Sequence, residues 1–355
     1  MNWADKRVLV TGGASFIGSH LVDLLVQKGA GYVRVADNLT SGRAENIQRH
    51  LQAGQVHLAN GDLLQPGVAD AVVRDIDIVF HLAAIHGGRG YMERHEAACA
   101  QNLLIDGTLI RAARDAGIQK FVYASSACVY PVKENGAGQF VILTEEMVGP
   151  PYNADKLYGW AKLMGEMTLQ AYYRDFGLKS VSCRFSPVYG ERGGENLAVM
   201  AMIARAFIRE NPFEVWGDGS QIRDWTYVGD IVNGMVLAAE EVEDATAVNL
   251  GTMEPVRVID AVQEIVAYAG YDAEIKLRPD MPTGPQHRVS SNELARRLLG
   301  WQPAVSFVEG LHRTADWYFA TKDPELVRAT LDRRLHERQP EGEAQPELVE
   351  AASQR

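Results

Sequence analysis

The sequence predicts an α/β protein in which a doubly wound parallel sheet is joined to a smaller lobe in the C-terminal half. The first observation is that short β-branched runs alternate with amphipathic stretches from residue 7 onward, which is typical of a parallel sheet covered by helices on both faces. The second is composition, because 46% hydrophobic residues in a chain of 355 are enough to bury a large core. The third is a glycine-rich turn after the first apolar run.

The predicted elements follow this alternation along the chain. Strands are expected at RVLVTG, YVRVADN, VHLANGD, DIVFHLAA and KFVYASSA, with helices at SHLVDLLVQKG and LLIDGTLIRAARDAG. A long helix over 158–175 and the strand KSVSCRF continue the pattern, and shorter strands FEVW, TYV, VNLG and IKLRP come later. We therefore expect a first domain over 1–185 and a second lobe over 186–332, from which some segments return to the first domain. Residues 333–355 are rich in charge, Gln and Pro, which predicts a disordered tail or a frayed helix.

Charge, cysteines and hydropathy exclude several classes of protein. The net charge of -11 disfavours a nucleic-acid or anionic-membrane partner, because such partners attract basic surfaces. Three widely spaced cysteines indicate neither a disulfide framework nor a metal site, so we expect no metal. The N-terminus does not resemble a secretory signal, and no apolar stretch approaches the roughly 20 residues that span a bilayer. We expect a cytoplasmic protein.

The glycine-rich turn at residues 11–18, TGGASFIG, lies between a strand and a helix, as a dinucleotide fingerprint requires. Gly12 permits the tight turn, Gly18 permits close packing of the helix, and the helix N-terminus suits a pyrophosphate. Asp37 ends the next strand, where a carboxylate binds the adenosine ribose hydroxyls and repels a 2′-phosphate, so NAD is favoured over NADP. Ser15 replaces the usual middle glycine and must fit beside the phosphates, while Asp62 either meets adenine or is a plain turn residue. The expected NAD-binding residues are Gly12, Ser15, Phe16, Ile17, Gly18, Asp37, Asn38, Asp62, Leu63, Leu82, Tyr158 and Lys162.

The catalytic candidates are Ser126, Cys128, Tyr158 and Lys162. Ser126 and Cys128 follow a strand end, where ligands bind in open α/β sheets. Tyr158 and Lys162 are one helical turn apart, so the ammonium can lower the tyrosine pKa and make it a general base for a substrate hydroxyl. A solvated helix face is the alternative for the pair, and a small buried hydrophobe is the alternative for Cys128.

With these residues the chain resembles the extended short-chain dehydrogenase/reductase family, in particular its nucleotide-sugar epimerases and dehydratases. The resemblance covers roughly residues 5 to 320, through TGGASFIGSH, FHLAA, YASSACVYP, YNADKLYGWAK, RFSPVYG, VWGDGSQIRDWTYVGDIV and GPQHRVSSNELARRLLGWQP. It implies a Rossmann-like NAD domain with a nucleotide-sugar lobe. It also implies a homodimer that packs through the YxxxK helix. Leu163, Met167 and Leu169 are compatible with that interface, and packing within the monomer explains these apolar positions equally well.

The resemblance also implies substrate contacts. Arg223 and Arg288 would hold the diphosphate or nucleotide, because guanidinium groups make bidentate contacts with phosphate, although a structural salt bridge is the alternative for each. Asn196 is a weaker candidate for the diphosphate, and Asn249 is a turn or core amide. Gly88 and Arg89 lie in the run 87–91, which together with 126–128 and FEVWGDG is most similar to the GDP-mannose 3,5-epimerases of the family. A GDP-hexose is therefore slightly favoured over a UDP-hexose.

The resemblance gives Cys128 an acid/base role at carbon 3 or 5 of the sugar. Its counterpart in those epimerases is a lysine, and Leu197 takes that place here, so a partner such as His86 or Arg89 would be needed. Dehydration is disfavoured because Ala127 and Cys128 replace an Asp-Glu pair. We expect an epimerase that works through a transient 4-keto sugar, by C4 inversion or by C3/C5 epimerisation. The alternatives are a net dehydrogenase or reductase and a nucleotide-binding sensor without turnover.

Overall fold

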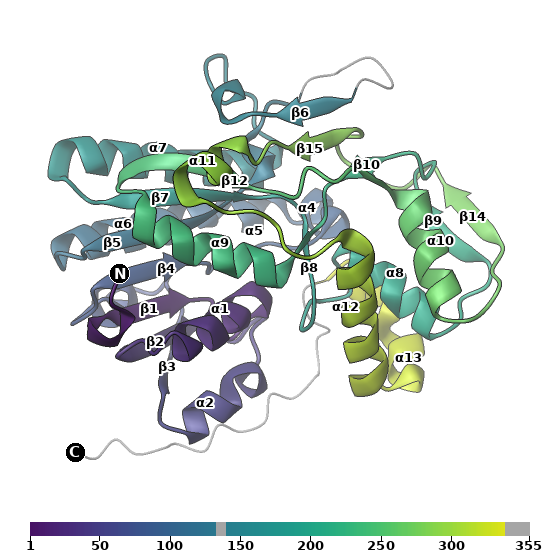
Figure 1. The fold of residues 1–355 in the computed structure, drawn as a ribbon, viewed down its shortest axis with the longest axis horizontal. Helices are drawn as coiled ribbons and strands as arrows, with labels where there is room; N and C mark the ends of the chain where they lie inside the picture. Colours follow the sequence, from purple (N-terminus) through teal and green to yellow (C-terminus); the bar gives the residue numbers. More distant parts are fainter. Residues whose placement is uncertain (133–139, 338–355) are drawn as a thin grey trace.

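A computed structural model describes residues 1–132 and 140–337, and its centre is a seven-stranded parallel sheet (Figure 1). The strand order is β12-β7-β5-β4-β1-β2-β3, which is the doubly wound, Rossmann-like arrangement that the alternation predicts. The fold class is therefore confirmed. The strands are β1 (Arg7–Thr11), β2 (Tyr32–Asp37), β3 (Val56–Asn60), β4 (Ile78–His81), β5 (Lys120–Ser126), β7 (Ser180–Phe185) and β12 (Asp244–Leu250).

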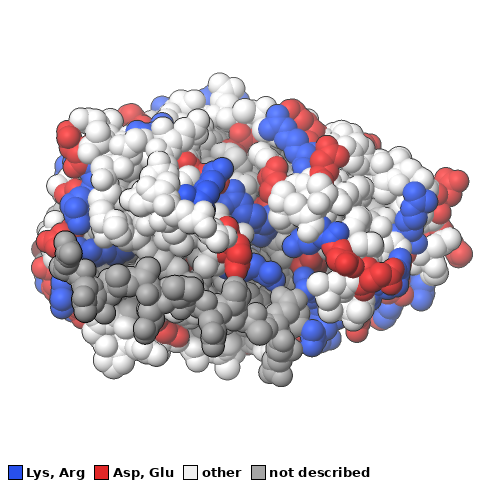
Figure 2. All heavy atoms as spheres, turned by 90° about the horizontal axis from the view of Figure 1, so that it is seen from below, with Lys and Arg blue, Asp and Glu red and all other residues white. Residues whose placement is uncertain are grey.

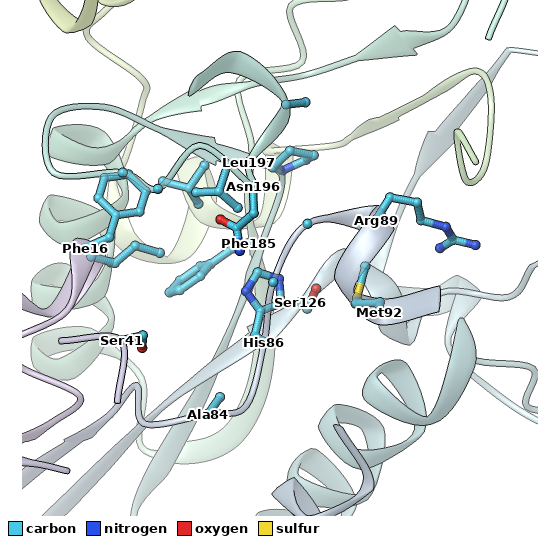
Figure 3. Close-up of a pocket in the computed structure, with 18 of the residues that line it drawn as sticks. Phe16, Ser41, Ala84, His86, Arg89, Met92, Ser126, Phe185, Asn196 and Leu197 are labelled. Atoms are coloured by element: carbon cyan, nitrogen blue, oxygen red, sulfur yellow. The ribbon is translucent and has the colours of Figure 1, made fainter. Parts of the chain in front are cut away.

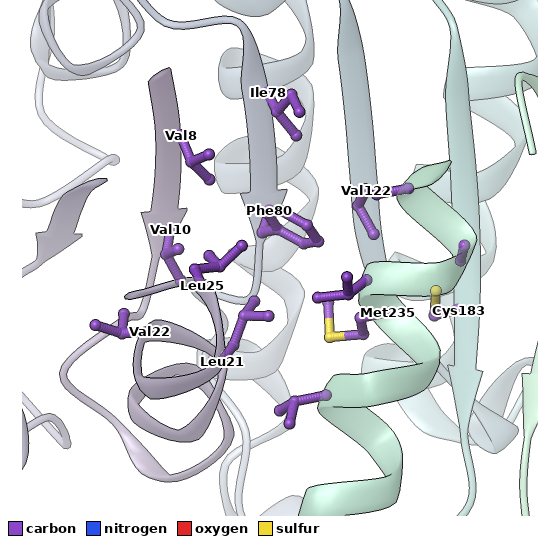
Figure 4. Packing of buried hydrophobic residues seen from close by; sticks show 14 of the residues in the cluster. Val8, Val10, Leu21, Val22, Leu25, Ile78, Phe80, Val122, Cys183 and Met235 are labelled. Carbon is purple, nitrogen blue, oxygen red and sulfur yellow. The ribbon is translucent and has the colours of Figure 1, made fainter. Parts of the chain in front are cut away.

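Helices cover both faces of this sheet because successive side chains of each buried strand point to opposite faces. Val8 and Val10 pack against Leu21, Leu25 and other side chains on one face (Figure 4), where α1 contacts α9. The intervening Leu9 packs on the other face, with α3, α6 and α7. The helices on the first face are α1 (Phe16–Gln27), α9 (Val228–Glu241) and α11 (Glu293–Leu299); those on the second are α3 (Val68–Val72), α6 (Asn102–Asp115) and α7 (Lys156–Phe176).

The smaller lobe has its own core, built mainly from residues after 186. It contains the parallel pair β9 (Phe213–Trp216) and β14 (Ile275–Arg278), packed against α8 (Ala198–Phe207), α10 (Val258–Tyr268), α12 (Phe307–Thr321) and α13 (Pro324–Arg334). Three segments of this half belong to the larger domain instead: β12 is a strand of the main sheet, and α9 and α11 pack on it.

Short elements connect the lobes and surround the cavity between them. The two-residue and three-residue strands pair as β6 (Val141–Leu143) with β15 (Arg288–Ser290), β8 (Val188–Tyr189) with β11 (Thr226–Tyr227), and β10 (Ile222–Arg223) with β13 (Val256–Arg257). Short helices α2 (Gln48–Gln52), α4 (Arg89–Arg94) and α5 (Glu96–Ala100) complete the described elements that are not 3-10 turns. No helix in the described residues combines the length and apolar character needed to cross a membrane.

The sequence prediction starts the tail at residue 333, which is before the end of the last described helix. The helix α13 continues to Arg334, and the next side chain, Leu335, is buried in the core of the smaller lobe. Arg334 Nη1 lies 3.4 Å from Glu195 Oε1, a contact between residues 139 positions apart. Residues 333–337 are therefore packed against the lobe, and the rest of the expected tail, 338–355, lies outside the described residues.

Candidate active site

A large cavity lies between the two lobes, at the carboxyl ends of β1, β4 and β5. Figure 2 shows Lys and Arg side chains interspersed with Asp and Glu on the face seen from below, and the whole chain has a net charge of -11. Within the described residues, basic side chains outnumber acidic ones along the cavity wall. The site can therefore attract an anion despite the acidic character of the protein.

The glycine turn at one end of the cavity is shaped for close approach of a ligand. Gly12 has φ +70°, and a Cβ there would lie 2.9 Å from the backbone nitrogen of Ala83. A Cβ on Gly18 would overlap the carbonyl oxygen of Gly12, so α1 can pack against the turn only through a glycine. Ser15 is the N-cap residue of α1 and lines the cavity without capping the helix. These features fit a pyrophosphate at the helix N-terminus.

Asp37 closes the same end of the cavity with only 5% of its surface exposed. Its carboxylate accepts hydrogen bonds from the backbone nitrogens of Ala14 (3.0 Å) and Leu39 (2.9 Å). Those bonds fix the carboxylate beside the glycine turn, where ribose hydroxyls would approach. The other residues expected to bind NAD at this end all line the cavity, namely Phe16, Ile17, Asn38, Asp62, Leu63 and Leu82.

Tyr158 and Lys162 are both buried on α7, at 6% and 1% exposure, and both line the cavity. A Cβ on Gly159 would overlap the carbonyl oxygen of Cys128, so this glycine lets α7 lie directly against the turn after β5. The Lys162 ammonium lies 5.9 Å from the centre of the Tyr158 ring. Burial raises the pKa of Tyr158 well above its usual range, while a hydrogen bond with Ser126 lowers it. Burial lowers the pKa of Lys162.

Ser126 and Cys128 belong to the turn that Gly159 contacts, and both line the cavity. The Ser126 hydroxyl accepts a hydrogen bond from the Cys128 nitrogen at 3.1 Å, which shapes the turn. Burial raises the pKa of the Cys128 thiol to about 11, with a further increase from the charge of Asp155. The thiol is therefore protonated near neutral pH, so it can donate a proton more readily than it can accept one.

Arg223 and Arg288, from the C-terminal half, and Arg89, from α4, are among the arginines that line the cavity. Arg223 donates to three carbonyl oxygens, each at 2.7 Å, those of Ile222, Gln286 and Thr283. Burial lowers the pKa of Arg223 to about 10, and the charges of Arg288 and Arg89 lower it further. Arg89 is held by Asp155 (2.7 Å) and by Glu93 (2.9 Å). The positive charges of Arg89, Arg223 and Arg288 repel one another, and an anion bound between them would reduce this repulsion.

His86, Asn196 and Leu197 face the cavity in Figure 3, whereas the Arg89 guanidinium points away from His86 and Ser126. The His86 ring is centred 4.8 Å from the Tyr158 ring. A Cβ on Gly88 would overlap the carbonyl oxygen of Asn196, so the two loops meet tightly. Leu197 offers no group that can exchange a proton. The orientation of His86 makes it a better placed second acid/base than Arg89.

The structure adds site residues that the sequence reasoning missed. Asp155 binds Arg89, and Asp224 accepts hydrogen bonds from Ser290 and Ser186, both at 2.7 Å. Glu195 lines the cavity while it binds the Tyr318 hydroxyl at 2.8 Å. The motif QIRD, with an acidic residue directly after Arg223, was the available signal for Asp224. Asn249, expected as a turn or core amide, is a core amide bound to Tyr130, Leu143 and Ser291.

Asp224 gives a prediction for the pH dependence of stability. Burial raises the pKa of its carboxyl from 3.8 to about 7, so between these values the folded protein binds a proton that the unfolded chain has released. Its contribution to the free energy of unfolding therefore falls as the pH rises from about 4 to about 7, and is constant above that range. We expect Asp224→Asn to gain stability relative to the wild type as the pH rises. Urea denaturation of both proteins near pH 5 and near pH 8 measures this, and an equal difference at both would contradict it.

Comparisons with known proteins agree with this architecture. The model of the "NAD dependent epimerase/dehydratase family" matches residues 8–251. GDP-mannose 3,5-epimerase of Arabidopsis thaliana is 32% identical over 318 residues, which are 88% of this chain and 82% of that protein. The UDP-glucose 4-epimerase of Thermotoga maritima, solved with UDP-glucose, has a TM-score of 0.79 at 30% identity, covering 89% of this chain and 99% of that one. The UDP-glucuronic acid 4-epimerase of Bacillus cereus, solved with its UDP-sugar and NAD, has a TM-score of 0.79 at 27% identity, with coverage of 89% and 100%.

The fold, the glycine turn and these relatives define a class of protein, the enzymes that bind a dinucleotide on a Rossmann-like domain and a nucleotide sugar across its carboxyl edge. Within that class, the chain belongs to the NAD-dependent epimerase/dehydratase family. Its cofactor is NAD, as the glycine turn and Asp37 predicted. When bound, NAD would supply a hydride acceptor at the carboxyl edge of the sheet.

Proposed function

We propose that the protein is a nucleotide-diphosphate-sugar epimerase that works through a transient 4-keto sugar. The observation that supports this most strongly is that Tyr158, Lys162 and Ser126 line one cavity together with the glycine turn. The hydroxyl to be oxidised, the general base and the hydride acceptor then meet at one end of the cavity. The solved relatives described above are 4-epimerases of UDP-sugars, which favours C4 inversion as the outcome.

Tyr158 accepts the proton of the sugar 4-hydroxyl when carbon 4 is oxidised and returns it when carbon 4 is reduced. An isolated buried phenol is a poor base, as the raised pKa of Tyr158 indicates, so the nearby Lys162 ammonium is needed to stabilise the phenolate. Ser126, which hydrogen-bonds Tyr158, holds the sugar hydroxyl in line with it. Burial of Tyr158 and Lys162 limits the access of water to the reacting atoms.

Arg223 and Arg288 are the residues proposed to bind the diphosphate of the substrate. Arg223 is already oriented by three carbonyl oxygens, and Arg288 is tethered to the Pro131 carbonyl oxygen at 3.0 Å, so neither has to be ordered when phosphate arrives. With Gly88 and Asn196 beside them, these residues form the proposed substrate subsite. We propose that the nucleobase of the substrate is guanine in preference to uracil. The similarity to the Arabidopsis GDP-mannose 3,5-epimerase supports this choice.

Epimerisation at carbon 3 or 5 is the second candidate, and the position of Cys128 on the cavity wall favours it. The 4-keto group acidifies the hydrogens on carbons 3 and 5. A pair of acid/base groups on opposite faces of the ring would then be required. Cys128 can supply one proton, and His86 is the available partner because Leu197 cannot act.

The test is to incubate the purified protein with GDP- and UDP-hexoses in deuterated water and to follow the products by NMR. Inversion at carbon 4 without deuterium supports the first candidate, while deuterium at carbon 3 or 5 supports the second. A Cys128→Ala variant separates them, because it should retain C4 inversion and lose the product epimerised at carbon 3 or 5. If no nucleotide sugar changes in either protein, or if NADH accumulates in proportion to product, the epimerase proposal is wrong.

We also propose that two copies pair through α6 and α7. Of the three residues compatible with such an interface, Leu163 and Leu169 follow the alternative of packing within the monomer, at 2% and 0% exposure, whereas Met167 is 37% exposed. The exposed large apolar side chains on α6 and on the first twelve residues of α7 are Leu103, Leu104, Leu157, Trp160, Met164 and Met167. On α7 their spacing of three and four residues places them on one face.

Trp160→Glu tests this interface. A carboxylate in the centre of an apolar contact would be desolvated without a partner, so we expect the variant to be monomeric where the wild type is dimeric. Light scattering measures both masses. The exposed Phe176→Glu, at the far end of α7, serves as the matched control that should remain dimeric. A monomeric wild-type protein would exclude the interface.

A further inference from the structure

A row of buried polar side chains lies behind Lys162, outside the cavity wall. Thr11 Oγ1 is 2.7 Å from His81 Nδ1, and His81 Nε2 is 3.0 Å from Asp106 Oδ1. The Tyr123 hydroxyl donates to the other oxygen of Asp106. None of these four side chains is more than 1% exposed, and none lines the cavity. They come from β1, β4, α6 and β5, so the row crosses the centre of the main sheet.

The protonation of this row follows from its partners. The pKa of Asp106 is lowered by the Lys162 charge and by its hydrogen bonds, against the effect of burial, so Asp106 is a carboxylate that only accepts. Burial lowers the pKa of His81, so the ring is neutral and its one hydrogen must be on Nε2, facing Asp106. Nδ1 then accepts from the Thr11 hydroxyl, whose oxygen also accepts from the Ala83 nitrogen at 3.2 Å. His81 therefore contributes no positive charge to balance Asp106.

Tyr123 connects Asp106 to Lys162. The Lys162 ammonium lies 4.6 Å from the centre of the Tyr123 ring, while the hydroxyl of that ring donates to Asp106. A phenol that donates to a carboxylate has a more electron-rich ring, which strengthens its attraction for a cation. A Cβ on Gly165 would overlap the Tyr123 hydroxyl, so this glycine gives the ring its position under α7.

The charges that face Lys162 differ in how far they are already neutralised. Glu166, one turn along α7, pairs with Arg184 at 2.7 Å, and this pair cancels most of the field of Glu166. Tyr123, Tyr158 and His81 are neutral in this environment. Among the described residues whose charge acts on Lys162, Asp106 is therefore the negative charge that has no cation closer to it than Lys162. A buried ammonium needs such a partner, because burial otherwise favours the neutral amine.

We propose that Asp106 is a positioning residue that acts through Tyr123 to keep Lys162 charged and directed at Tyr158. This inference deepens the proposed function and rests on it, because it assumes that Tyr158 and Lys162 perform the acid/base chemistry. It assigns a catalytic purpose to a carboxylate that touches neither substrate nor cofactor.

The pH dependence distinguishes this role from a merely structural one. Asp106 raises the pKa of Lys162 and also raises that of Tyr158, because its negative charge favours the ammonium and opposes the phenolate. Asp106→Asn keeps the size and most hydrogen-bonding capacity of the side chain but removes the charge. Both pKa values should then fall, so the whole bell-shaped profile of kcat/KM should move to lower pH, by about one pH unit for a nearby buried charge.

Thr11→Val is the matched control, because it breaks the far end of the same buried row without changing any charge near Lys162. It should lower stability yet leave the position of the pH profile unchanged. A second readout is NMR of protein with isotope-labelled lysine, in which the Lys162 signal is identified by its loss in Lys162→Met. Its titration midpoint should fall in Asp106→Asn and not in Thr11→Val.

If Asp106→Asn fails to fold, Asp106→Ser provides a smaller uncharged side chain that can still accept from Tyr123. A pH profile and a Lys162 midpoint that stay in place in the folded variant would overturn the proposal and leave Asp106 a structural residue. That failure is distinct from failure of the proposed function, which would appear as full activity in a Tyr158→Phe protein.

Discussion

Replacing Tyr158 with phenylalanine is expected to lower kcat by about 10²–10⁴-fold, the range that general acid–base catalysis contributes. The ring would remain in its buried place against His86, at a centre distance of 4.8 Å in the wild type, while the proton acceptor would be lost. The substrate anchors lie on the other lobe, so KM should change far less than kcat. Steady-state kinetics on the preferred nucleotide sugar measure both constants.

Tyr173→Phe is the control for this substitution. It makes the same chemical change on the same helix, but Tyr173 is 37% exposed and lies outside the cavity wall. Its activity should equal that of the wild type. NAD binding, measured separately by fluorescence, should persist in Tyr158→Phe because the glycine turn is untouched. Retention of most of the activity in Tyr158→Phe would exclude Tyr158 as the base.

The main sheet and the dinucleotide end of the cavity could be predicted because their signals are local in the sequence. The strands read as apolar runs, and the turn at 12–18 combines three glycines with a strand before it and a helix after it. Asp37 follows at the expected separation. Each of these features depends on residues that are close in the chain, so the pattern alone is sufficient to predict it.

Contacts between distant residues could not be predicted in this way. The binding of Arg89 by Asp155 joins residues 66 positions apart, and no periodicity relates the two. The burial of Leu163 and Leu169 depends on which helices and strands surround α7, since a helix covered on more than one side has apolar residues around much of its surface. The side chains that remain exposed are known only once the neighbours are placed.

The sequence contains a signal for the last described helix, α13, which the polar composition of the C-terminal segment obscured. The overall polarity of the C-terminal segment suggested disorder, yet Asp323 and Pro324 form a typical helix start. In the structure the Asp323 side chain accepts from the nitrogens of Glu325 and Leu326, and α13 follows. Capping residues were more informative here than average composition.

Arg184→Met is expected to lower the free energy of unfolding by about 3–5 kcal/mol, the usual result of removing one partner from a buried ion pair. Arg184 and Glu166 are 5% and 2% exposed in their side chains and lie 2.7 Å apart. Methionine would fill similar volume but leave the Glu166 carboxylate buried without its cation. The loss would also reach the active site, because the Ser125 hydroxyl donates to Glu166 and Ser126 is the next residue on β5.

Arg111→Met provides the comparison, because Arg111 forms an ion pair with Asp70 of similar length, 2.9 Å, but at 40% and 45% exposure. Solvent screens that pair, so the same substitution should leave stability almost unchanged. Denaturation in urea at neutral pH measures both variants against the wild type. The two substitutions remove the same group, although Arg184 also donates to Tyr130 and to the Glu145 carbonyl oxygen, and Arg111 also pairs with Asp115. Equal losses in the two variants would mean that Glu166 finds another partner or water when Arg184 is absent, and that the pair does not hold β7 against α7.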